Sequence, residues 1–218
     1  MIKPIVCLLV LAVCSQIHAT DITKLVQETQ KIAQTPGNMS LVWWIPLEFW
    51  EESLDQDPRM TEEQKADFIE ILEEYTVFAV VESEIGTFGS FKHKPKSEIR
   101  DNVKFEIDGD EIEQIPYIAV NQDASNFFIT MKPLMGQMMG EMGKGMEFIV
   151  FPNEIGGERL LDPRSEGAFT FTSFGNEFKW RLPLGSLMPP MIDQSTGEEF
   201  PGNYSFNPYN GNELVRKE

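Results

Sequence analysis

Cysteine is scarce in this chain of 218 residues. It occurs twice, as Cys7 and Cys14, and both lie in an apolar segment at the N-terminus. From residue 20 onward the chain therefore has no disulfide, no thiolate nucleophile and no cysteine-ligated metal site. Its stability has to come from a packed core, and about 200 residues are enough for one sizeable domain.

Basic charge is scarce as well. The chain has 18 lysines and arginines against 35 aspartates and glutamates, a formal net charge of −17 at pH 7. Binding to a phosphate backbone needs clustered basic side chains, so we expect no nucleic-acid partner. The same balance works against attraction to an anionic membrane surface. It suits an exported protein, because an acidic surface keeps a protein soluble.

Groups that carry catalysis are few. After the N-terminal segment His93 is the only histidine, and it lies between Lys92 and Lys94. A Ser-His-Asp triad would have to use it, and the chain has no Gly-x-Ser-x-Gly elbow. The glycines between 140 and 145 follow a predicted helix rather than a strand, which is the wrong context for a nucleotide-binding loop. We therefore expect no cofactor and favour a function without catalysis.

A long hydrophobic run is also missing. The longest one, Ile5–Val13, has about nine residues, whereas a helix needs about 20 to span a bilayer. Lys3 precedes the run and small Ala19 follows it, which is typical of a secretory signal over residues 1–19. We expect cleavage after Ala19, a periplasmic or extracellular protein, and no transmembrane segment after cleavage. The alternative is a lipoprotein anchored through Cys14, in a lipobox-like sequence with an unusual valine before the cysteine.

Residues 20–183 carry the patterns of an α+β domain, in which N-terminal helices precede a mostly antiparallel sheet. Helical spacing or caps predict helices over Thr20–Gln34, after Pro46, after the capping box that begins at Thr61, and over Asn126–Met142. Alternating or continuous apolar residues predict strands at Thr76–Val81, Val103–Ile107, Met146–Phe151 and on both sides of Gly175-Asn176. Residues 184–218 form an irregular, turn-rich tail.

The densest aromatic block contains Trp43, Trp44 and Trp50. Large aromatic side chains usually lie in the core, where each buries about 150–250 Å². Exposed tryptophans would instead make a platform for a carbohydrate or another ligand. They would also line a cleft in which carboxylates could hydrolyse a substrate.

Methionines recur at intervals of three and four residues between 131 and 146. This spacing places them on one face of a helix, either in the core or against a partner protein or peptide. Thioethers also bind Cu(I), so copper handling is an alternative that would use Met135, Met138, Met139 and Met142. The neighbouring Gly136, Gly140 and Gly143 would let another segment of backbone approach closely.

The tail contains two turn sequences, Asp193-Gln194-Ser195-Thr196-Gly197 and Phe206-Asn207-Pro208-Tyr209-Asn210-Gly211. Over about 25 residues they resemble the two knuckles of a zinc ribbon. Asp193, Thr196, Asn207 and Asn210 stand where the cysteine ligands would be. One carboxylate, a hydroxyl and two amides are poor ligands for zinc, so we expect turns that keep their shape and hold no zinc. The alternatives are a site for a hard ion such as Ca²⁺, and chance similarity.

As a whole, the Trp-Trp-Ile-Pro block and the ribbon-like tail resemble those of a group of exported bacterial proteins, whose tails keep cysteines. That resemblance implies no activity. The expected function is thus that of an exported, non-enzymatic protein that binds a protein or peptide partner. The alternatives are the carboxylate hydrolase with its tryptophan-lined cleft and the Cu(I)-handling protein.

Overall fold

The computed structural model describes residues 21–217, apart from the side chain of Met138. The predicted signal, with Cys7, Cys14 and the cleavage site after Ala19, lies outside the described residues. No helix in the described part is long and apolar enough to cross a membrane. The fold is α+β with antiparallel sheets, as the sequence predicts.

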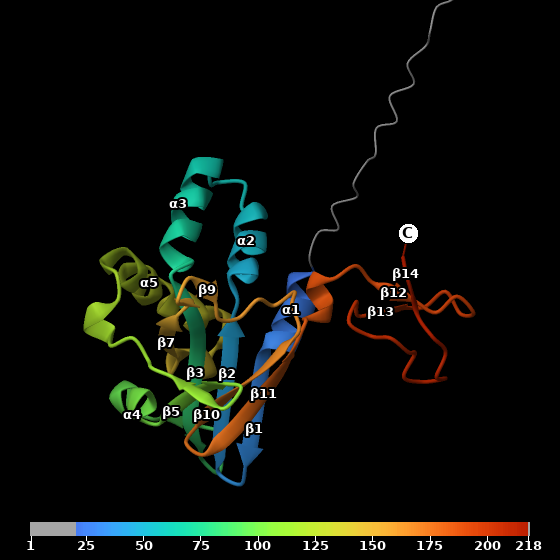
Figure 1. The fold of residues 1–218 in the computed structure, drawn as a ribbon. Helices are drawn as coiled ribbons and strands as arrows, with labels where there is room; N and C mark the ends of the chain where they lie inside the picture. Colours follow the sequence, from blue (N-terminus) through green and yellow to red (C-terminus); the bar gives the residue numbers. More distant parts are fainter. Residues whose placement is uncertain (1–20, 218) are drawn as a thin grey trace, which may run out of the picture.

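Two antiparallel sheets, packed face to face, form the centre of the molecule (Figure 1). The five-stranded sheet has the order β1 (Gln30–Thr35), β2 (Asn38–Ile45), β3 (Tyr75–Ile85) and β4 (Phe91–His93), with β7 (Glu147–Pro152) also paired to β3. The four-stranded sheet has the order β11 (Asn176–Leu182), β10 (Gly167–Ser173), β5 (Val103–Ile107) and β6 (Asp110–Ile112). A small separate hairpin joins β8 (Glu154–Ile155) to β9 (Glu158–Arg159).

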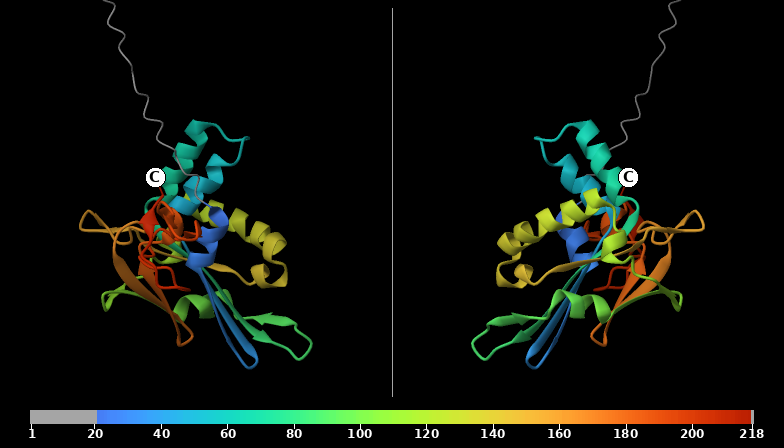
Figure 2. Two further views of the ribbon diagram at one scale, coloured as in Figure 1. Left: turned by 90° about the vertical axis from the view of Figure 1, so that its right-hand side faces the viewer. Right: turned by 90° about the vertical axis from the view of Figure 1, so that its left-hand side faces the viewer.

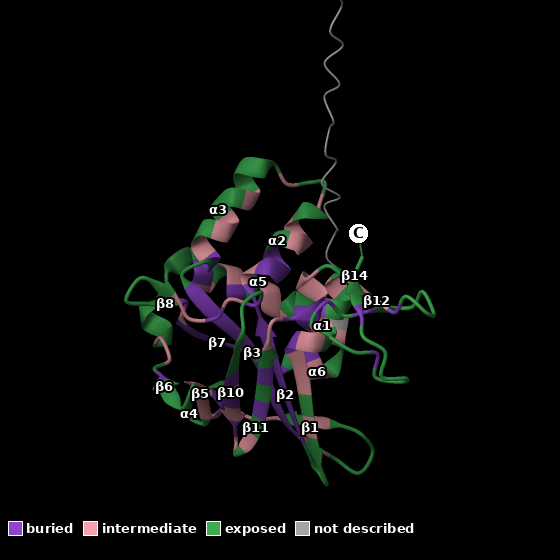
Figure 3. Cartoon of the chain, turned by 45° about the vertical axis from the view of Figure 1, so that its right-hand side comes forward, coloured by how far each residue is buried: buried purple, intermediate pink, exposed green. Residues whose placement is uncertain are grey.

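Aromatic rings fill the space between the two sheets. Phe78 of β3 is fully buried and stacks on Phe171 of β10, with 4.4 Å between ring centroids. Trp44 of β2 meets Phe169 edge-on at 4.8 Å. Such pairs contribute about 0.5–1.5 kcal/mol each beyond the burial of their area. Figure 3 shows the buried residues concentrated on the central strands, and the hairpin ends exposed.

The other face of the five-stranded sheet is covered by α5 (Gln122–Met139), so the molecule has three layers (Figure 2). Phe128 of α5 stacks on Phe148 of β7 at 5.0 Å. The hairpin of α2 (Leu47–Asp55) and α3 (Glu62–Leu72) joins this layer through Trp50, whose ring lies 5.1 Å from Phe127. Shorter helices complete the fold: α1 (Ile22–Thr29), α4 (Lys96–Asp101), α6 (Glu141–Lys144) and the 3-10 turns η1 (Tyr117–Ala119) and η2 (Gly185–Leu187).

Several local predictions are confirmed. Thr61 and Gln64 make the capping box at the start of α3. Val103–Ile107 is β5, and the predicted hairpin is formed by β10 and β11. Its two-residue turn is Phe174 and Gly175, between the paired Ser173 and Asn176, and so lies one residue earlier than the predicted Gly175-Asn176. Gly175 has a φ of 80°, a value that glycine adopts without strain.

Two predictions need correction. The helices are interspersed among the strands rather than gathered at the N-terminus. The first helix also ends at Thr29, and Gln30–Thr35 forms β1 paired with β2. Trp43 and Trp180 both donate to Thr29, at 3.1 Å and 3.2 Å. These tertiary bonds and the sheet pairing override the helical spacing, and Gly37, with a φ of 80°, lies in the turn between β1 and β2.

The tail forms its own small sheet from β12 (Met191–Ile192), β13 (Glu199–Phe200) and β14 (Val215–Arg216). It meets the rest of the chain at η2, where Glu28 of α1 accepts from the backbone of Gly185 and Ser186 at 2.9 Å each.

Candidate functional site: a basic pocket at the sheet edge

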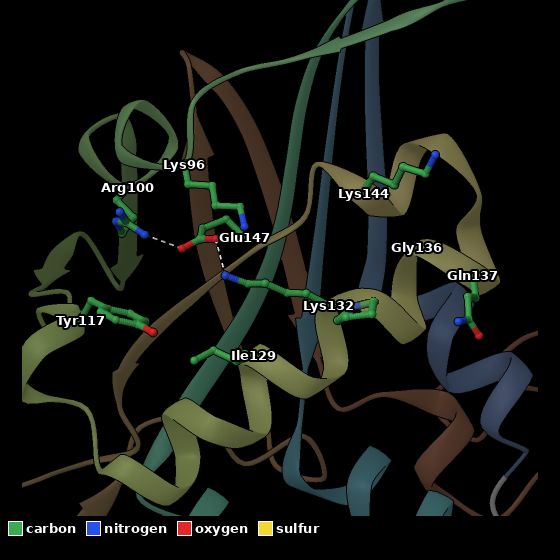
Figure 4. A pocket seen from close by; sticks show the side chains of 10 residues that line it. Lys96, Arg100, Tyr117, Ile129, Lys132, Gly136, Gln137, Lys144 and Glu147 are labelled. Carbon is green, nitrogen blue, oxygen red and sulfur yellow. Dashed lines mark hydrogen bonds and ion pairs between the residues drawn. The ribbon is translucent and has the colours of Figure 1, made fainter.

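A cavity of about 700 Å³ opens beside β7, which has β3 as its one strand partner among residues 21–217. Three helical segments surround it: α4, η1 and the pair α5–α6 (Figure 4). Its lining residues are Lys96, Arg100, Tyr117, Ile129, Lys132, Pro133, Gly136, Gln137, Lys144 and Glu147. This volume is typical of pockets for small ligands or for short segments of a partner.

Helical periodicity explains why these side chains meet. Lys96 and Arg100 are four residues apart on α4 and so share one face. The α5 residues that line the cavity, at positions 129, 132, 133, 136 and 137, form a stripe along a second face. A different face of α5 carries Phe128 and Met135 into the core. One helix therefore anchors itself to the sheet and presents a wall of the pocket.

Glu147 is the buried centre of the pocket, with 1% of its surface exposed. Arg100 donates to its Oε1 at 2.5 Å, and Lys132 donates to its Oε2 at 2.6 Å. A buried carboxylate has to be paired, and here both oxygens have a cationic partner. The ion triad holds Arg100 and Lys132 in place and leaves one net positive charge at the cavity wall.

The pocket gathers positive charge in an acidic protein. Four cations and one carboxylate line it, whereas the whole chain has 18 basic and 35 acidic residues. Lys144 forms an ion pair with Glu141, and Figure 4 shows it at the far end of the cavity from Glu147. Lys96 is exposed and has no ion-pair partner within the described part of the chain. The triad and Lys96 thus leave the cavity electropositive.

The remaining wall is apolar. Tyr117 and Ile129 line the cavity, and the guanidinium of Arg100 lies 5.9 Å from the centre of the Tyr117 ring. A narrower space continues inward between Phe128, Phe148 and Val150, with a volume of about 20 Å³. A ligand here would find positive charge and apolar surface side by side.

The three tryptophans predicted as a ligand surface are buried in the core. Trp43, Trp44 and Trp50 expose 5%, 2% and 5% of their surfaces. Trp43 packs edge-on against Phe49, and Phe49 in turn contacts Trp50. Rings buried in this way are not open to a sugar and line no substrate cleft.

The methionines pack as the hydrophobic interpretation predicts. Met135 is buried, and Met139 and Met142 are half-buried against the core. A Cβ atom added to Gly143 would lie 2.2 Å from the carbonyl oxygen of Met135, so this glycine allows α6 to pack closely on α5. The fourth member of the predicted copper set, Met138, has no described side chain.

The ribbon-like tail brings three of its four predicted positions together by hydrogen bonds. Asp193, which is 1% exposed, accepts from the side-chain amides of Asn207 at 2.7 Å and Asn210 at 2.9 Å. Ser195 and Asn212, which the sequence analysis did not single out, also donate to it. Thr196 is exposed, and its hydroxyl accepts from the backbone of Glu198 instead of bonding to the carboxylate of Asp193.

This cluster stands where a metal would stand in a ribbon. Gly197 and Gly211 adopt positive φ values of 73° and 78° and close the two turns with backbone bonds to Asp193 and Asn207. The side-chain amides and the hydroxyl of Ser195 donate to the carboxylate of Asp193, so its lone pairs are occupied. The hydrogen bonds from Ser195, Asn210 and Asn207 hold the pKa of Asp193 far below its ordinary value.

His93 connects two layers rather than serving a triad. Its Nδ1 lies 2.8 Å from the hydroxyl of buried Ser83, and its Nε2 lies 2.9 Å from the carbonyl oxygen of Glu141. The neighbouring lysines separate: Lys92 and Lys94 both pair with Glu84, while Lys96 lines the pocket.

The pocket was not predicted from the sequence because its cations are dispersed from residue 96 to residue 144. One signal was present: Lys96 and Arg100 have the spacing of one helix face, and so do Ile129, Lys132 and Pro133. The methionines lie on a competing face of the second helix, and their spacing was the stronger signal.

No family model, no curated protein and no solved structure matches this chain.

Proposed function

We propose that this protein is a binding protein whose basic pocket holds an anionic group of its ligand. The observation that carries the proposal is the concentration of four cations around one buried carboxylate in a chain of net charge −17. Arg100 and Lys132 already hold one carboxylate, that of Glu147, at the wall of this cavity. The cavity therefore has cations fixed in positions where they can bind a negatively charged group. In a partly desolvated cavity such charge is less screened than on an open surface.

The proposed place of action is outside the cytoplasm. It is supported by the signal-like residues 1–19, with Lys3, the apolar run Ile5–Val13 and Ala19. The acidic balance is compatible with an exported protein.

The experiment is a calorimetric titration with benzoate, an anion that carries an apolar ring. Lys96→Glu reverses the one pocket cation that is exposed and has no ion pair in the part described, so the substitution breaks no ion pair within residues 21–217. We expect this variant to bind benzoate about fivefold more weakly or worse.

The matched control is Lys179→Glu, which makes the same change of charge on β11, in the other sheet. We expect it to bind like the unaltered protein. Equal affinity of all three proteins, or no benzoate binding at millimolar concentration, would refute an anion site in this pocket.

A further inference from the structure

We propose that the ligand of the basic pocket is a polypeptide segment that places an acidic side chain next to an apolar one. This inference rests on the proposed anion-binding function and adds the class of partner.

The first support is an apolar border around the charged cavity. Ile118 on η1 is 94% exposed, and Ile129 on α5 is 53% exposed. Ile129 lines the cavity, and Ile118 follows the lining residue Tyr117. Large apolar side chains this exposed, on two helical segments that border one pocket, are typical of an interaction surface.

The second support is the extent of surface that a ligand has to cover. An ion small enough to enter the cavity would meet the Glu147 triad and Lys96 but would leave Ile118 in water and cover little of the half-exposed Ile129. A chain that passes over the cavity would contact both helical borders while one of its side chains enters. Burial of an exposed isoleucine is a substantial gain, so such a ligand would bind more tightly than the isolated anion.

The third support is complementarity of charge. The acidic chain repels an acidic segment over most of its surface, and the pocket is where a local excess of cations reverses this. The acidic side chain would therefore enter between Lys96 and Arg100, and the apolar neighbour would lie on η1. The charged contact would fix the position of the peptide along the pocket, and the apolar contact would supply affinity.

The test is a selection from a displayed library of random 12-residue peptides on the purified full chain. We expect the enriched peptides to share an acidic residue adjacent to an apolar one. As synthetic peptides they should bind about tenfold more weakly to Ile118→Ser than to the unaltered protein.

Phe88→Ser is the matched control, because Phe88 is fully exposed in the turn between β3 and β4. It should leave peptide binding unchanged, and Ile118→Ser should leave benzoate binding unchanged. If benzoate binds but the enriched peptides lack the acidic–apolar pair, or ignore Ile118→Ser, this inference fails and the anion site stands. If neither benzoate nor any peptide binds, the proposed function fails as well.

Discussion

Three buried glutamates, Glu48, Glu82 and Glu147, are held by side chains from distant parts of the chain. Glu48 and Glu147 each have two cationic partners, whereas Glu82 accepts from two serine hydroxyls. Four cations of this acidic chain thus neutralise two acids of the interior. Glu147 and Glu82 each make a separate prediction at the scale of one residue.

Glu147→Gln should destabilise the protein by about 2–4 kcal/mol, because it leaves Arg100 and Lys132 without a counter-charge in a largely buried place. Urea unfolding measures this change. Glu177→Gln, which removes the carboxylate of an exposed pair with Lys179, should leave the unfolding midpoint unchanged. Equal effects of the two substitutions would contradict the structural role of the triad.

Burial raises the pKa of Glu82 above its ordinary value of 4.5. An acid whose pKa is raised on folding favours the folded state below its ordinary pKa, and this contribution is lost as pH rises through the folded value. The stability of the unaltered protein relative to Glu82→Gln should therefore increase as the pH is lowered from 7.5 to 5. Urea midpoints of both proteins at the two pH values measure this difference, and a parallel response would be evidence against the raised pKa.

Asp193 makes the opposite prediction, because its pKa is lowered by the hydrogen bonds that it accepts. Its contribution is present above the ordinary pKa and lost only as pH falls through the lowered one. Asp193→Asn should release the tail, with faster hydrogen exchange at the amides of Gly197 and Gly211. A metal chelator should leave exchange in the unaltered tail unchanged, and faster exchange with chelator would show that a metal holds these turns.

At the scale of secondary structure, local signals predicted elements wherever they agreed with the packing. The Thr61 capping box, the strand Val103–Ile107 and the hairpin at Gly175 all have strong local patterns. The first helix was predicted too long. Its helical spacing continues after Thr29, but these residues pair with β2, and the spacing of residues in the sequence cannot reveal such a pairing. The α4 helix escaped notice because six residues are too few for a periodic pattern.

The pocket shows the same limit. Sequence spacing identified α5 and its methionine face, but the pocket is formed by the other face together with α4 and β7. Which of two faces of a helix meets the core depends on tertiary contacts such as that of Phe128 with Phe148. The stripe that lines the pocket is therefore present in the sequence, but the sequence does not show that it faces α4 and β7.

The junction of α5 and α6 provides a matched pair of glycine substitutions. Gly143→Ala should destabilise the protein by about 1–3 kcal/mol, since its new Cβ would press on the backbone of Met135. Gly136→Ala should stabilise it by up to about 1 kcal/mol, because its Cβ would make an ordinary contact with Lys144 and alanine favours a helix. Thermal unfolding of both variants tests the pair, and a harmless Gly143→Ala would refute the close packing of α6.

At the scale of the whole molecule, an acidic protein carries an electropositive cavity between α4, α5 and β7. Its net charge of −17 opposes any anion at long range, so recognition has to depend on the near field of Lys96, Arg100 and Lys132. The buried tryptophans and methionines supply the stability that a chain without cysteine in residues 20–218 needs. The cations and the exposed apolar border provide the surface for recognition.

Anion binding in the basic pocket can be located by a nuclear magnetic resonance titration of the isotope-labelled protein with benzoate. We expect saturable shifts of the backbone amides of Lys96, Arg100, Tyr117, Ile129 and Lys132, the residues that face the cavity. Raised salt should weaken the binding. Unchanged amides at these five positions, or saturable shifts confined to another surface, would show that the pocket is not an anion site.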